Sequence, residues 1–561
     1  MNFTTCKLSR PYGRHSIIAV TCLFCAGPSI AHEPGGGSAP YEMTEAIGFE
    51  QTEPRLHLEI LDRETKRSLP ARFSLELDGS PFVARGLDEQ GIRLTVSHQL
   101  TNQRFTALYS RGTGALEVPL SPDARSGTVY VVKGYEYLPA KVSFDVRQGE
   151  AKARVELHRW SDIAEQGWFA TDEHLHFDRT DARHDAQWLT ILSGEGLSTG
   201  HFLVLKGGNF EGVWAKQYAY GAAGEAYDGL HLVRSGEEYR DSAQGHINLL
   251  GLDRVVEPIS TGGIGTPSVA ESYPPFAAVL QRARESGGIG GHAHGGTQGR
   301  SETLELDAVL GMTDFVEIAN AFLTELDAWY RLMNCGFNLP PTAGTDLPYF
   351  PYRSWHQPLL GEPRMYLRTG TDRSFDAWKA ALGRGEVFVT SGPIVQFTVN
   401  GVGPGGLVRL PEGGGEVEVI ASLASPRPLK ELRIIRNGQS VAVNVRQHRK
   451  DSIQYLQVRQ RIRIDQSSWL AAYGIGETKA LIQQKLNVEL PAFAHTAAVR
   501  ILVGDKPIRV AEDVLRLGEK LKKQRDFYRV NAVLANESQR LHFTRLFDEA
   551  ISKVEAMAED R

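Results

Sequence analysis

The spacing of apolar residues changes three times along the chain, and each spacing restricts the folds that the segment can adopt. Across residues 55–159, apolar residues recur at every second position, as at Leu56, Leu58 and Ile60. Period-two spacing that is interrupted by glycine, proline and aspartate is typical of short, half-buried strands. We therefore expect an N-terminal β-sandwich-like domain over residues 55–159, preceded by a linker over residues 32–54.

Residues 160–401 show a different pattern. Short apolar runs at 188–192, 202–205, 246–250 and 315–318 alternate here with helix-compatible stretches such as 276–285. We interpret the runs as strands. Alternation of strands and helices predicts an α/β domain with buried parallel strands, for which a barrel is one arrangement.

Period-two spacing returns after residue 401 and gives way to helical spacing near the end of the chain. Asn437-Gly438 separates two alternating runs, which is the strongest short signal for a β-hairpin. Residues 402–505 are therefore predicted to form a second β module. Residues 506–561 are predicted to be a helical segment, because their apolar residues recur with a period near 3.6. With 561 residues, several domains are expected.

The N-terminus has the composition of an export signal. Lys7, Arg10 and Arg14 precede an apolar run over residues 17–26 and the small residues of 29–31. This order predicts a signal peptide over residues 1–31, cleaved near Ala31, and a periplasmic or secreted protein. Cys22 and Cys25 lack the usual residues that precede a lipidated cysteine, so lipidation is a minor alternative.

The remaining composition narrows the classes of partner. After cleavage only Cys335 would remain, and we interpret it as a buried structural thiol. Lys and Arg number 62 against 67 Asp and Glu, without a long block of either sign, so nothing favours binding to nucleic acid. No later apolar segment reaches transmembrane length. A small molecule is the expected substrate, and the oligomeric state stays open.

The strongest chemical signal is the sequence Asp-Glu-His-Leu-His over residues 172–176. On an extended segment, side chains two residues apart share a face, so His174 and His176 would point to the same side and could chelate a metal. An isolated pair of this kind is more often an ordinary polar surface. Other imidazoles and carboxylates lie at the ends of strand-like runs, however: Glu237, Glu238, His246, His292, His294, Glu317 and Asp346. Imidazole and carboxylate together suit zinc, iron or manganese.

These motifs, in this order, resemble the PHP (polymerase and histidinol phosphatase) superfamily of metallohydrolases. The motifs are 172–176, 236–238 with 245–246, 293–294, 316–320 and 342–346. Residues 167–169, 343–346, 364–366 and 389–393 are similar to the carbaryl-hydrolase-like (CehA/McbA) branch. The resemblance covers roughly residues 160–401.

The resemblance implies a fold, a ligand set and an activity. The implied fold is a distorted (βα)7 barrel, flanked in that branch by β modules. The metal ligands would be six residues: His174, His176, Glu238, His246, His294 and Asp346. They would hold one to two divalent ions, either zinc, manganese or iron. Two departures concern this set: the usual Thr-Asp-His motif is replaced by 193–196, which contains Glu195, and no histidine follows Asp346 closely.

We therefore expect an exported hydrolase in which metal-bound hydroxide attacks an ester, carbamate or phosphoester. Glu195 or His292 is predicted to handle protons. Trp355, His356, Arg364 and Tyr366 are predicted to line the substrate pocket.

Two other functions remain open. The protein could be a non-catalytic binding protein that a metal stabilises. It could instead be a serine hydrolase using Ser198, because residues 196–200 fit the G-x-S-x-G pattern, although a strand-like run rather than a helix follows them.

Overall fold

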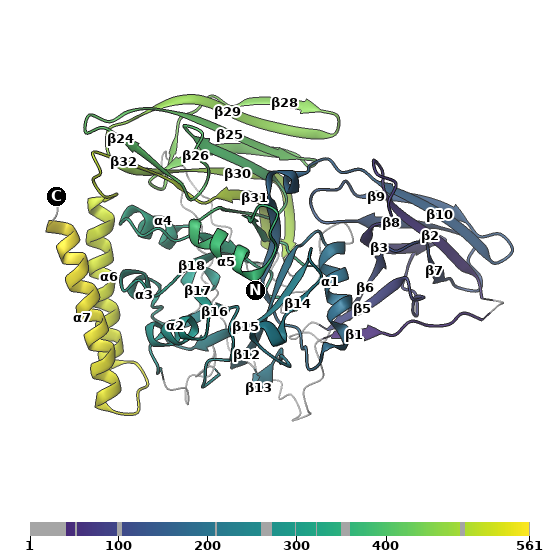
Figure 1. Ribbon diagram of the computed structural model, residues 1–561, viewed down its shortest axis with the longest axis horizontal. Helices are drawn as coiled ribbons and strands as arrows, with labels where there is room; N and C mark the ends of the chain where they lie inside the picture. Colours follow the sequence, from purple (N-terminus) through teal and green to yellow (C-terminus); the bar gives the residue numbers. More distant parts are fainter. Residues whose placement is uncertain are drawn as a thin grey trace, which may run out of the picture. The chain divides into compact units, whose positions relative to one another are not determined.

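The computed structural model describes residues 41–50, 53–97, 104–207, 210–259, 272–297, 299–320, 323–348, 360–482 and 488–559. The predicted signal peptide lies outside these residues, as do Trp355 and His356, so these predictions stay as they are. The described chain is mixed α/β and dominated by strands in several sheets (Figure 1).

Ten strands precede the α/β region. They are β1 (Tyr41–Thr44), β2 (Arg55–Asp62), β3 (Pro70–Leu77), β4 (Ser80–Phe82), β5 (Gly91–Ser97), β6 (Arg104–Arg111), β7 (Leu116–Pro119), β8 (Ser126–Val132), β9 (Ala140–Asp145) and β10 (Glu150–Leu157). One sheet has the order β1-β5-β6-β3-β8-β9, with β4 on β3, and a second sheet has the order β10-β2-β7. Alternating residues such as Leu58, Phe73 and Val131 are buried in one shared core, as period-two spacing predicts.

Strands and helices then alternate through the region with the histidine motifs. The elements are β11 (Trp168–Leu175), α1 (Asp185–Gly194), β12 (Thr199–Gly207), β13 (Phe210–Trp214), β14 (Ala226–Tyr227), β15 (Leu232–Asp241), β16 (Gly245–Leu250), α2 (Phe276–Glu285), β17 (Ile289–His292), α3 (Leu304–Val309), β18 (Phe315–Asn320), β19 (Leu323–Thr324), α4 (Asp327–Asn334), β20 (Pro341–Ala343), β21 (Arg364–Arg368), α5 (Phe375–Arg384) and β22 (Val387–Thr390). Three of the four predicted strands and the predicted helix at 276–285 are confirmed.

The predicted strand at 188–192 is wrong, because these residues lie in helix α1. Trp188, Ile191 and Leu192 are all fully buried, and their spacing of three and four residues places them on one face of a helix. A short apolar run does not by itself distinguish a strand from a buried helix face.

The strands of this region form a curled, mixed sheet, and the distorted (βα)7 barrel that the resemblance implied is not shown by the described residues. The ladder runs β20-β18-β17-β16-β15-β12-β11-β21, with parallel pairs such as β11–β12 and antiparallel pairs such as β15–β16. The antiparallel pairs do not fit a purely parallel barrel. No ladder joins β20 to β11, so the described sheet stays open.

Strand β11, which lies next to the end strand β21, nevertheless approaches the chain just beyond β20 at the other end of this curled sheet. The backbone N–H of Asp346 donates to the carbonyl of His174 at 2.8 Å, and the N–H of His176 donates to the carbonyl of Leu347 at 2.6 Å. Gly344 permits this approach, because a Cβ there would lie 2.4 Å from the Cβ of His174. The histidine motif and Asp346 therefore meet.

The chain continues into further strands and ends in two helices. These are β23 (Ile394–Val399), β24 (Leu407–Leu410), β25 (Gly415–Ser425), β26 (Leu429–Arg436), β27 (Gln439–Val441), β28 (Arg446–Lys450), β29 (Ile453–Ile464), β30 (Ser468–Ile482), β31 (Val488–Thr496), β32 (Val499–Val503), α6 (Ala511–Val530) and α7 (Glu537–Glu559). The predicted hairpin is confirmed: Arg436 pairs with Gln439, and Asn437 and Gly438 both have positive φ. β31 pairs with β22, so this β module extends the curled sheet.

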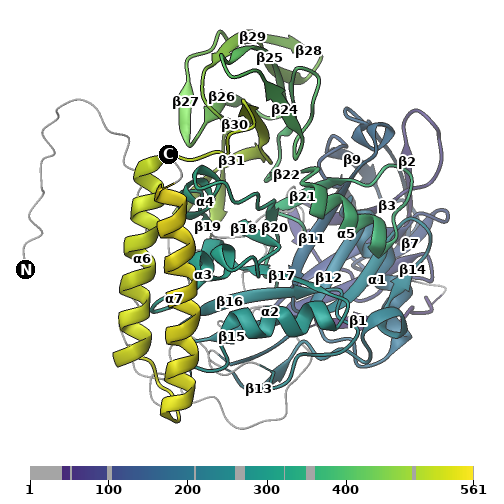
Figure 2. The ribbon, with the colours of Figure 1, turned by 60° about the vertical axis from the view of Figure 1, so that its left-hand side comes forward.

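Helices α6 and α7 lie side by side in both ribbon views (Figure 2). Their buried residues include Leu517, Leu521, Phe543 and Phe547, at the spacing predicted from the sequence. No helix among the described residues is both long and apolar enough to cross a membrane.

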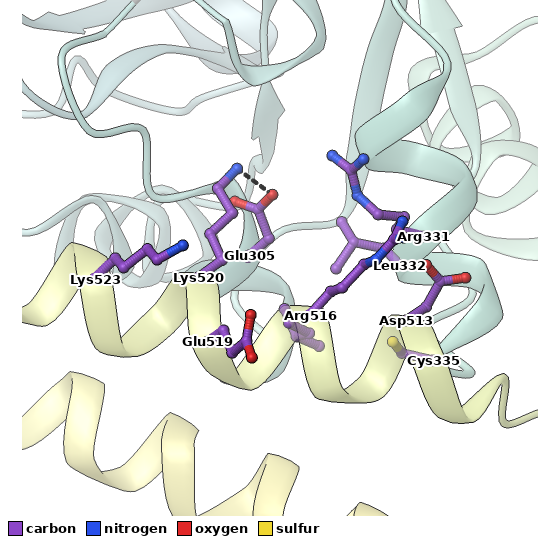
Figure 3. A pocket seen from close by; sticks show the side chains of 10 residues that line it. Glu305, Arg331, Leu332, Cys335, Asp513, Arg516, Glu519, Lys520 and Lys523 are labelled. Atoms are coloured by element: carbon purple, nitrogen blue, oxygen red, sulfur yellow. Dashed lines mark hydrogen bonds and ion pairs between the residues drawn. The ribbon is translucent and has the colours of Figure 1, made fainter.

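A pocket of about 310 Å³ lies between α6 and the α/β region (Figure 3), and Cys335 lines it. The thiol is unpaired and buried, and burial raises its pKa to about 12. A thiol with such a pKa stays protonated and unreactive at neutral pH. This agrees with the expected structural role of Cys335.

Candidate metal centre

The end of strand β11 directs two buried imidazoles toward a common point. The Nδ1 atom of His176 lies 2.8 Å from the carbonyl oxygen of Leu203. Because a carbonyl can only accept, Nδ1 carries the proton and Nε2 faces the centre. His174 is oriented similarly, since its Nδ1 lies 2.9 Å from Oε1 of Glu317. Both side chains are almost fully excluded from solvent.

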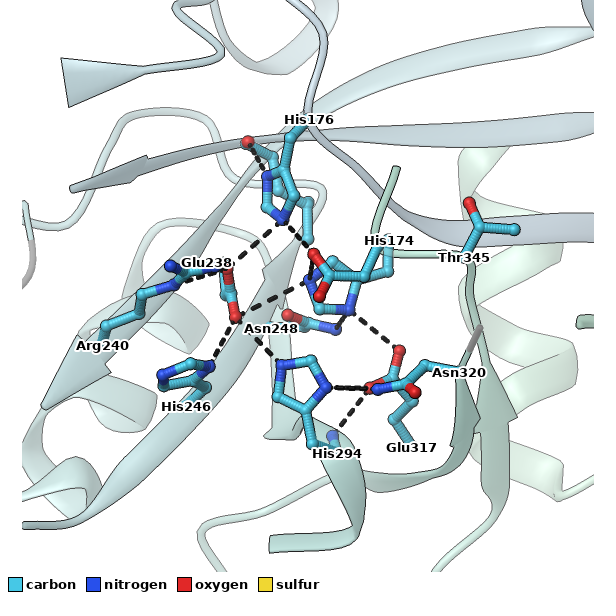
Figure 4. Close-up of polar contacts among 12 residues, drawn as sticks. His174, His176, Glu238, Arg240, His246, Asn248, His294, Glu317, Asn320 and Thr345 are labelled. Carbon is cyan, nitrogen blue, oxygen red and sulfur yellow. Dashed lines mark hydrogen bonds and ion pairs between the residues drawn. The ribbon is translucent and has the colours of Figure 1, made fainter. Parts of the chain in front are cut away.

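Glu238 of strand β15 lies at the middle of the assembly (Figure 4). Its Oε2 is 3.3 Å from Nε2 of His176, and its Oε1 is 3.7 Å from Nε2 of His174. Oδ1 of Asp346 lies 3.1 Å from Nε2 of His176 and 3.6 Å from Nε2 of His174. These four residues offer ligand atoms that all lie within 4.8 Å of one another.

Two more histidines approach Glu238 from the opposite side. Nδ1 of His246 lies 2.9 Å from Oε1 of Glu238, and Nε2 of His294 lies 3.3 Å from the same oxygen. The backbone N–H of His294 donates to Oε2 of Glu317 at 2.7 Å, and Nδ1 contacts the side-chain amide of Asn320. Glu317 thus orients both His174 and His294. All six ligands that the resemblance implied therefore lie in one neighbourhood, in overlapping groups.

The backbone is unusual at two of these residues. His294 and Asp346 have φ values of 53° and 55°, in the left-handed region that residues other than glycine seldom adopt. Such conformations persist only where the surrounding structure imposes them, and they are frequent at binding and catalytic sites.

Arg240 brings a fixed positive charge into the assembly. Strand β15 pairs with β16 so that Glu238 is opposite Asn248 and Arg240 is opposite His246. Nε of Arg240 donates to Oε2 of Glu238 at 2.8 Å, and its Nη2 donates to the same oxygen. Burial disfavours the carboxylate, but Arg240 and the neighbouring imidazoles outweigh burial and hold the pKa of Glu238 well below its usual value.

The pKa values of the two motif histidines are raised, whereas the pKa of Glu238 is lowered. Burial disfavours their charged forms, yet the nearby carboxylates prevail: Glu317, Asp346 and Glu238 raise the pKa of His174 well above its usual value. Asp346 and Glu238 likewise raise the pKa of His176. Each imidazole therefore requires a positive charge between its Nε2 atom and the carboxylates, either a second proton or a cation.

The residues present fit a divalent metal. Nε2 of His174, Nε2 of His176 and Oδ1 of Asp346 are buried without a hydrogen-bond partner in the described chain. Buried polar atoms normally have partners, so an unsatisfied convergent set is a candidate cation site. Imidazole nitrogen and carboxylate oxygen are donors that zinc, manganese and iron accept, so identity is open among these metals.

Glu195 does not lie with this assembly. It caps the end of α1, where its Oε1 accepts from Nε of Arg72 at 2.8 Å and from the hydroxyl of Tyr109 at 2.8 Å. Arg72 and Tyr109 belong to β3 and β6 of the N-terminal sheet. The structure thus pairs Glu195 with Arg72 at the boundary between two parts of the chain, away from the centre where it was predicted to handle protons.

His292 also lies elsewhere, although His294 is only two residues away. Nε2 of His292 is 2.9 Å from Oδ2 of Asp307 in α3, and its ring lies against Phe276 of α2. Strand β17 ends at His292, and the left-handed turn at His294 breaks the alternation of faces. The predicted proton-handling role of His292 therefore has no geometric support.

The two predicted pocket residues that the structure describes are packed within the fold. Nη1 of Arg364 donates to the carbonyls of Glu195 and Gly196 at 3.0 and 3.1 Å, which satisfies the end of helix α1. Tyr366 is fully buried and stacks on Phe388 with 4.8 Å between ring centroids. These contacts explain both residues structurally.

Four contributors to the centre were absent from the predicted ligand set: Glu317, Arg240, Asn248 and Asn320. Glu317 and Asn320 belong to a motif used for the resemblance, and Arg240 is two residues after Glu238 on the same strand face. Strand alternation could have identified Arg240.

Comparisons of the chain with protein-family models, curated proteins and solved structures find no match.

Proposed function

We propose that this protein is an exported, metal-dependent hydrolase of the PHP type that cleaves an ester, carbamate or phosphoester bond. The observation that carries the proposal concerns His174, His176 and Asp346. Their buried ligand atoms point to one place beside Glu238 and have no hydrogen-bond partner in the described chain. A barrel-type likeness is part of the proposal. It is supported by the curled sheet, in which the end of β11 with the histidine motif contacts Asp346, just beyond β20.

His174, His176, Glu238 and Asp346 would hold the cation, with His246 and His294 on the other side of Glu238. A divalent cation bound there would lower the pKa of a water ligand and polarise the scissile group. Glu317 and the carbonyl of Leu203 fix the orientation of the two motif imidazoles, and such partners raise metal affinity by holding ligands in place.

Protons would be handled by His246 rather than by the residues predicted from sequence. Burial lowers the pKa of His246 to about 4, so its imidazole is neutral at pH 7. Its Nε2 has no hydrogen-bond partner in the described chain, and its side chain is 8% exposed, the most exposed of the four histidines. A neutral imidazole at the edge of the centre can accept a proton from an attacking water.

A non-catalytic protein stabilised by a metal is the second candidate. The four central side chains are between 0 and 5% exposed, and structural metal sites are closed in this way, whereas catalytic sites keep an exchangeable position. The serine hydrolase alternative is not proposed, because residues 196–200 follow helix α1 and lead into strand β12. That is the reverse of a nucleophile elbow.

The test is a screen of aryl esters, aryl carbamates and phosphomonoesters with the metal-stripped protein and added zinc, manganese or iron. We expect metal-dependent turnover that the double substitution His174→Ala, His176→Ala abolishes. His158→Ala is the matched control, because His158 is exposed and pairs with Glu64 outside the centre. Turnover that persists in the double variant would contradict the proposal, and metal binding without turnover would favour the structural role.

A further inference from the structure

The fixed cation of the metal centre is Arg240, and its position bears on how many metal ions the centre holds. Arg240 is on the same face of β15 as Glu238 and is 7% exposed through its side chain. Nε and Nη2 both donate to one oxygen, Oε2 of Glu238. A carboxylate oxygen has about two lone-pair directions, so these two donors occupy that oxygen fully.

Two overlapping groups of candidate ligands share Glu238, and its other carboxylate oxygen, Oε1, is the atom available to both. The group with His174, His176 and Asp346 includes Glu238, and so does the group with His246 and His294. A carboxylate that bridges two cations most often gives one oxygen to each of them. Because Arg240 donates twice to Oε2, two cations would have to share Oε1, which His246 and His294 already approach at 2.9 and 3.3 Å. This arrangement favours one cation at Glu238 over a bridged pair.

The net charge of the centre also favours a single bound metal ion. Three carboxylates face the imidazoles, from Glu238, Glu317 and Asp346, and one guanidinium faces them, from Arg240. With neutral imidazoles these groups carry a net charge of minus two. One divalent cation neutralises that charge, whereas a second would leave an uncompensated positive charge in a buried site.

Resting on the function proposed above, we infer that Arg240 takes the place of a second metal ion, so that the centre binds a single divalent cation through His174, His176, Asp346 and Oε1 of Glu238. The guanidinium supplies the second positive charge permanently. It also orients Glu238, while His246 and His294 stay without metal on the far side of that carboxylate.

The experiment measures the stoichiometry of Mn²⁺ and Zn²⁺ binding to the full metal-stripped chain by calorimetry, with elemental analysis after gel filtration. We expect one equivalent for the wild-type protein and two for Arg240→Gln, which frees Oε2 and removes the positive charge. Arg240→Lys retains the positive charge and should still bind one equivalent of metal. Arg234→Gln is the matched control, because Arg234 is on the same strand but pairs with Glu225 outside the centre, and it should also bind one.

Two or more tightly bound ions in the wild-type protein would overturn the inference, even if no variant folds. A folded Arg240→Gln protein that still binds one ion would overturn it as well. Both results leave the proposed hydrolase intact. Conversely, one equivalent in the wild-type protein and two in the variant, without turnover of any ester, carbamate or phosphoester, would retain the inference and contradict the hydrolase.

Discussion

Two buried sets of charged side chains in this protein differ in one respect that separates a candidate site from a structural contact. Around Glu238, imidazole and carboxylate atoms face one another at 2.9 to 3.7 Å, and several have no hydrogen-bond partner in the described chain. Around Glu195, Oε1 receives the guanidinium of Arg72 and the hydroxyl of Tyr109, and only Oε2 has no hydrogen-bond partner in the described chain. The first set requires a further cation, and the second carries its own. Burial of charge alone therefore does not mark a functional site.

The largest effect on activity should follow from a change within the first set. Asp346→Asn removes a negative ligand but retains its size, and we expect turnover to fall by at least ~100-fold, because metal catalysis depends on several kcal/mol of charge stabilisation. Steady-state kinetics with saturating metal measure this change. Asp181→Asn, in an exposed turn paired with Arg183, is the control and should retain activity. Normal activity of the Asp346→Asn protein would contradict the assignment of the first set as a metal site.

The equivalent change in the second set should affect stability and leave metal binding unchanged. Glu195→Ala removes the carboxylate that pairs with the buried guanidinium of Arg72, which should lower the free energy of unfolding by about 3–5 kcal/mol. Urea denaturation measures this loss, and metal titration should give the wild-type affinity. The double variant Arg72→Met, Glu195→Leu should recover most of the stability, since neither charge remains buried. A loss of metal from Glu195→Ala would instead indicate that Glu195 takes part in metal binding.

The six ligands predicted from the sequence lie together in the first set, whereas the contact between Glu195 and Arg72 in the second set was not predicted. Strand alternation is the physical reason for the difference. His174 and His176 share a face because they lie at the end of a regular strand, as the spacing required. The same argument fails for His292 and His294, because the strand ends between them and the backbone enters a left-handed turn. The partner of Glu195 lies 123 residues away in another sheet, and no local pattern in the sequence indicates such a contact.

The fold shows the same limit. Period-two spacing correctly predicted strands such as β2 and β3, and the Asn437-Gly438 hairpin is present. The strand predicted at 188–192 was wrong, because helix α1 buries the same apolar residues on one of its faces. Pairing direction depends on which strands meet, so the antiparallel strands β15, β16 and β17 could not be anticipated from composition or spacing.

A smaller effect should follow from the residue that orients the motif imidazole. Glu317→Gln retains the shape of the side chain but weakens its acceptance from Nδ1 of His174, so metal affinity should fall by about 10- to 100-fold. Competition with a fluorescent chelator measures this affinity. Glu173→Gln is a demanding control, because Glu173 is buried next to His174 on strand β11 and burial raises its pKa well above the usual value. Equal losses in both variants would show general destabilisation rather than orientation.

The smallest expected effect concerns a buried histidine without a carboxylate partner. His201 lies 4.5 Å from Trp378 between ring centroids, and burial lowers its pKa to about 3. Because the folded pKa is below the unfolded value, the neutral imidazole contributes stability above pH 6.5, and this contribution is lost as pH falls toward 3. Between pH 7.5 and 5 the loss amounts to about 2 kcal/mol. His201→Phe should lack that part of the pH dependence in urea denaturation at the two pH values. An unchanged dependence would show that His201 does not titrate as its surroundings require.

The central claim is that the buried histidines around Glu238 hold a divalent metal. Elemental analysis of the purified protein, loaded with metal and freed of excess ion by gel filtration, tests it most directly. We predict one zinc, manganese or iron ion per chain, lost in the His174→Ala, His176→Ala variant while the fold persists by circular dichroism. A folded wild-type protein without bound metal, or a variant that keeps the ion, would contradict the account.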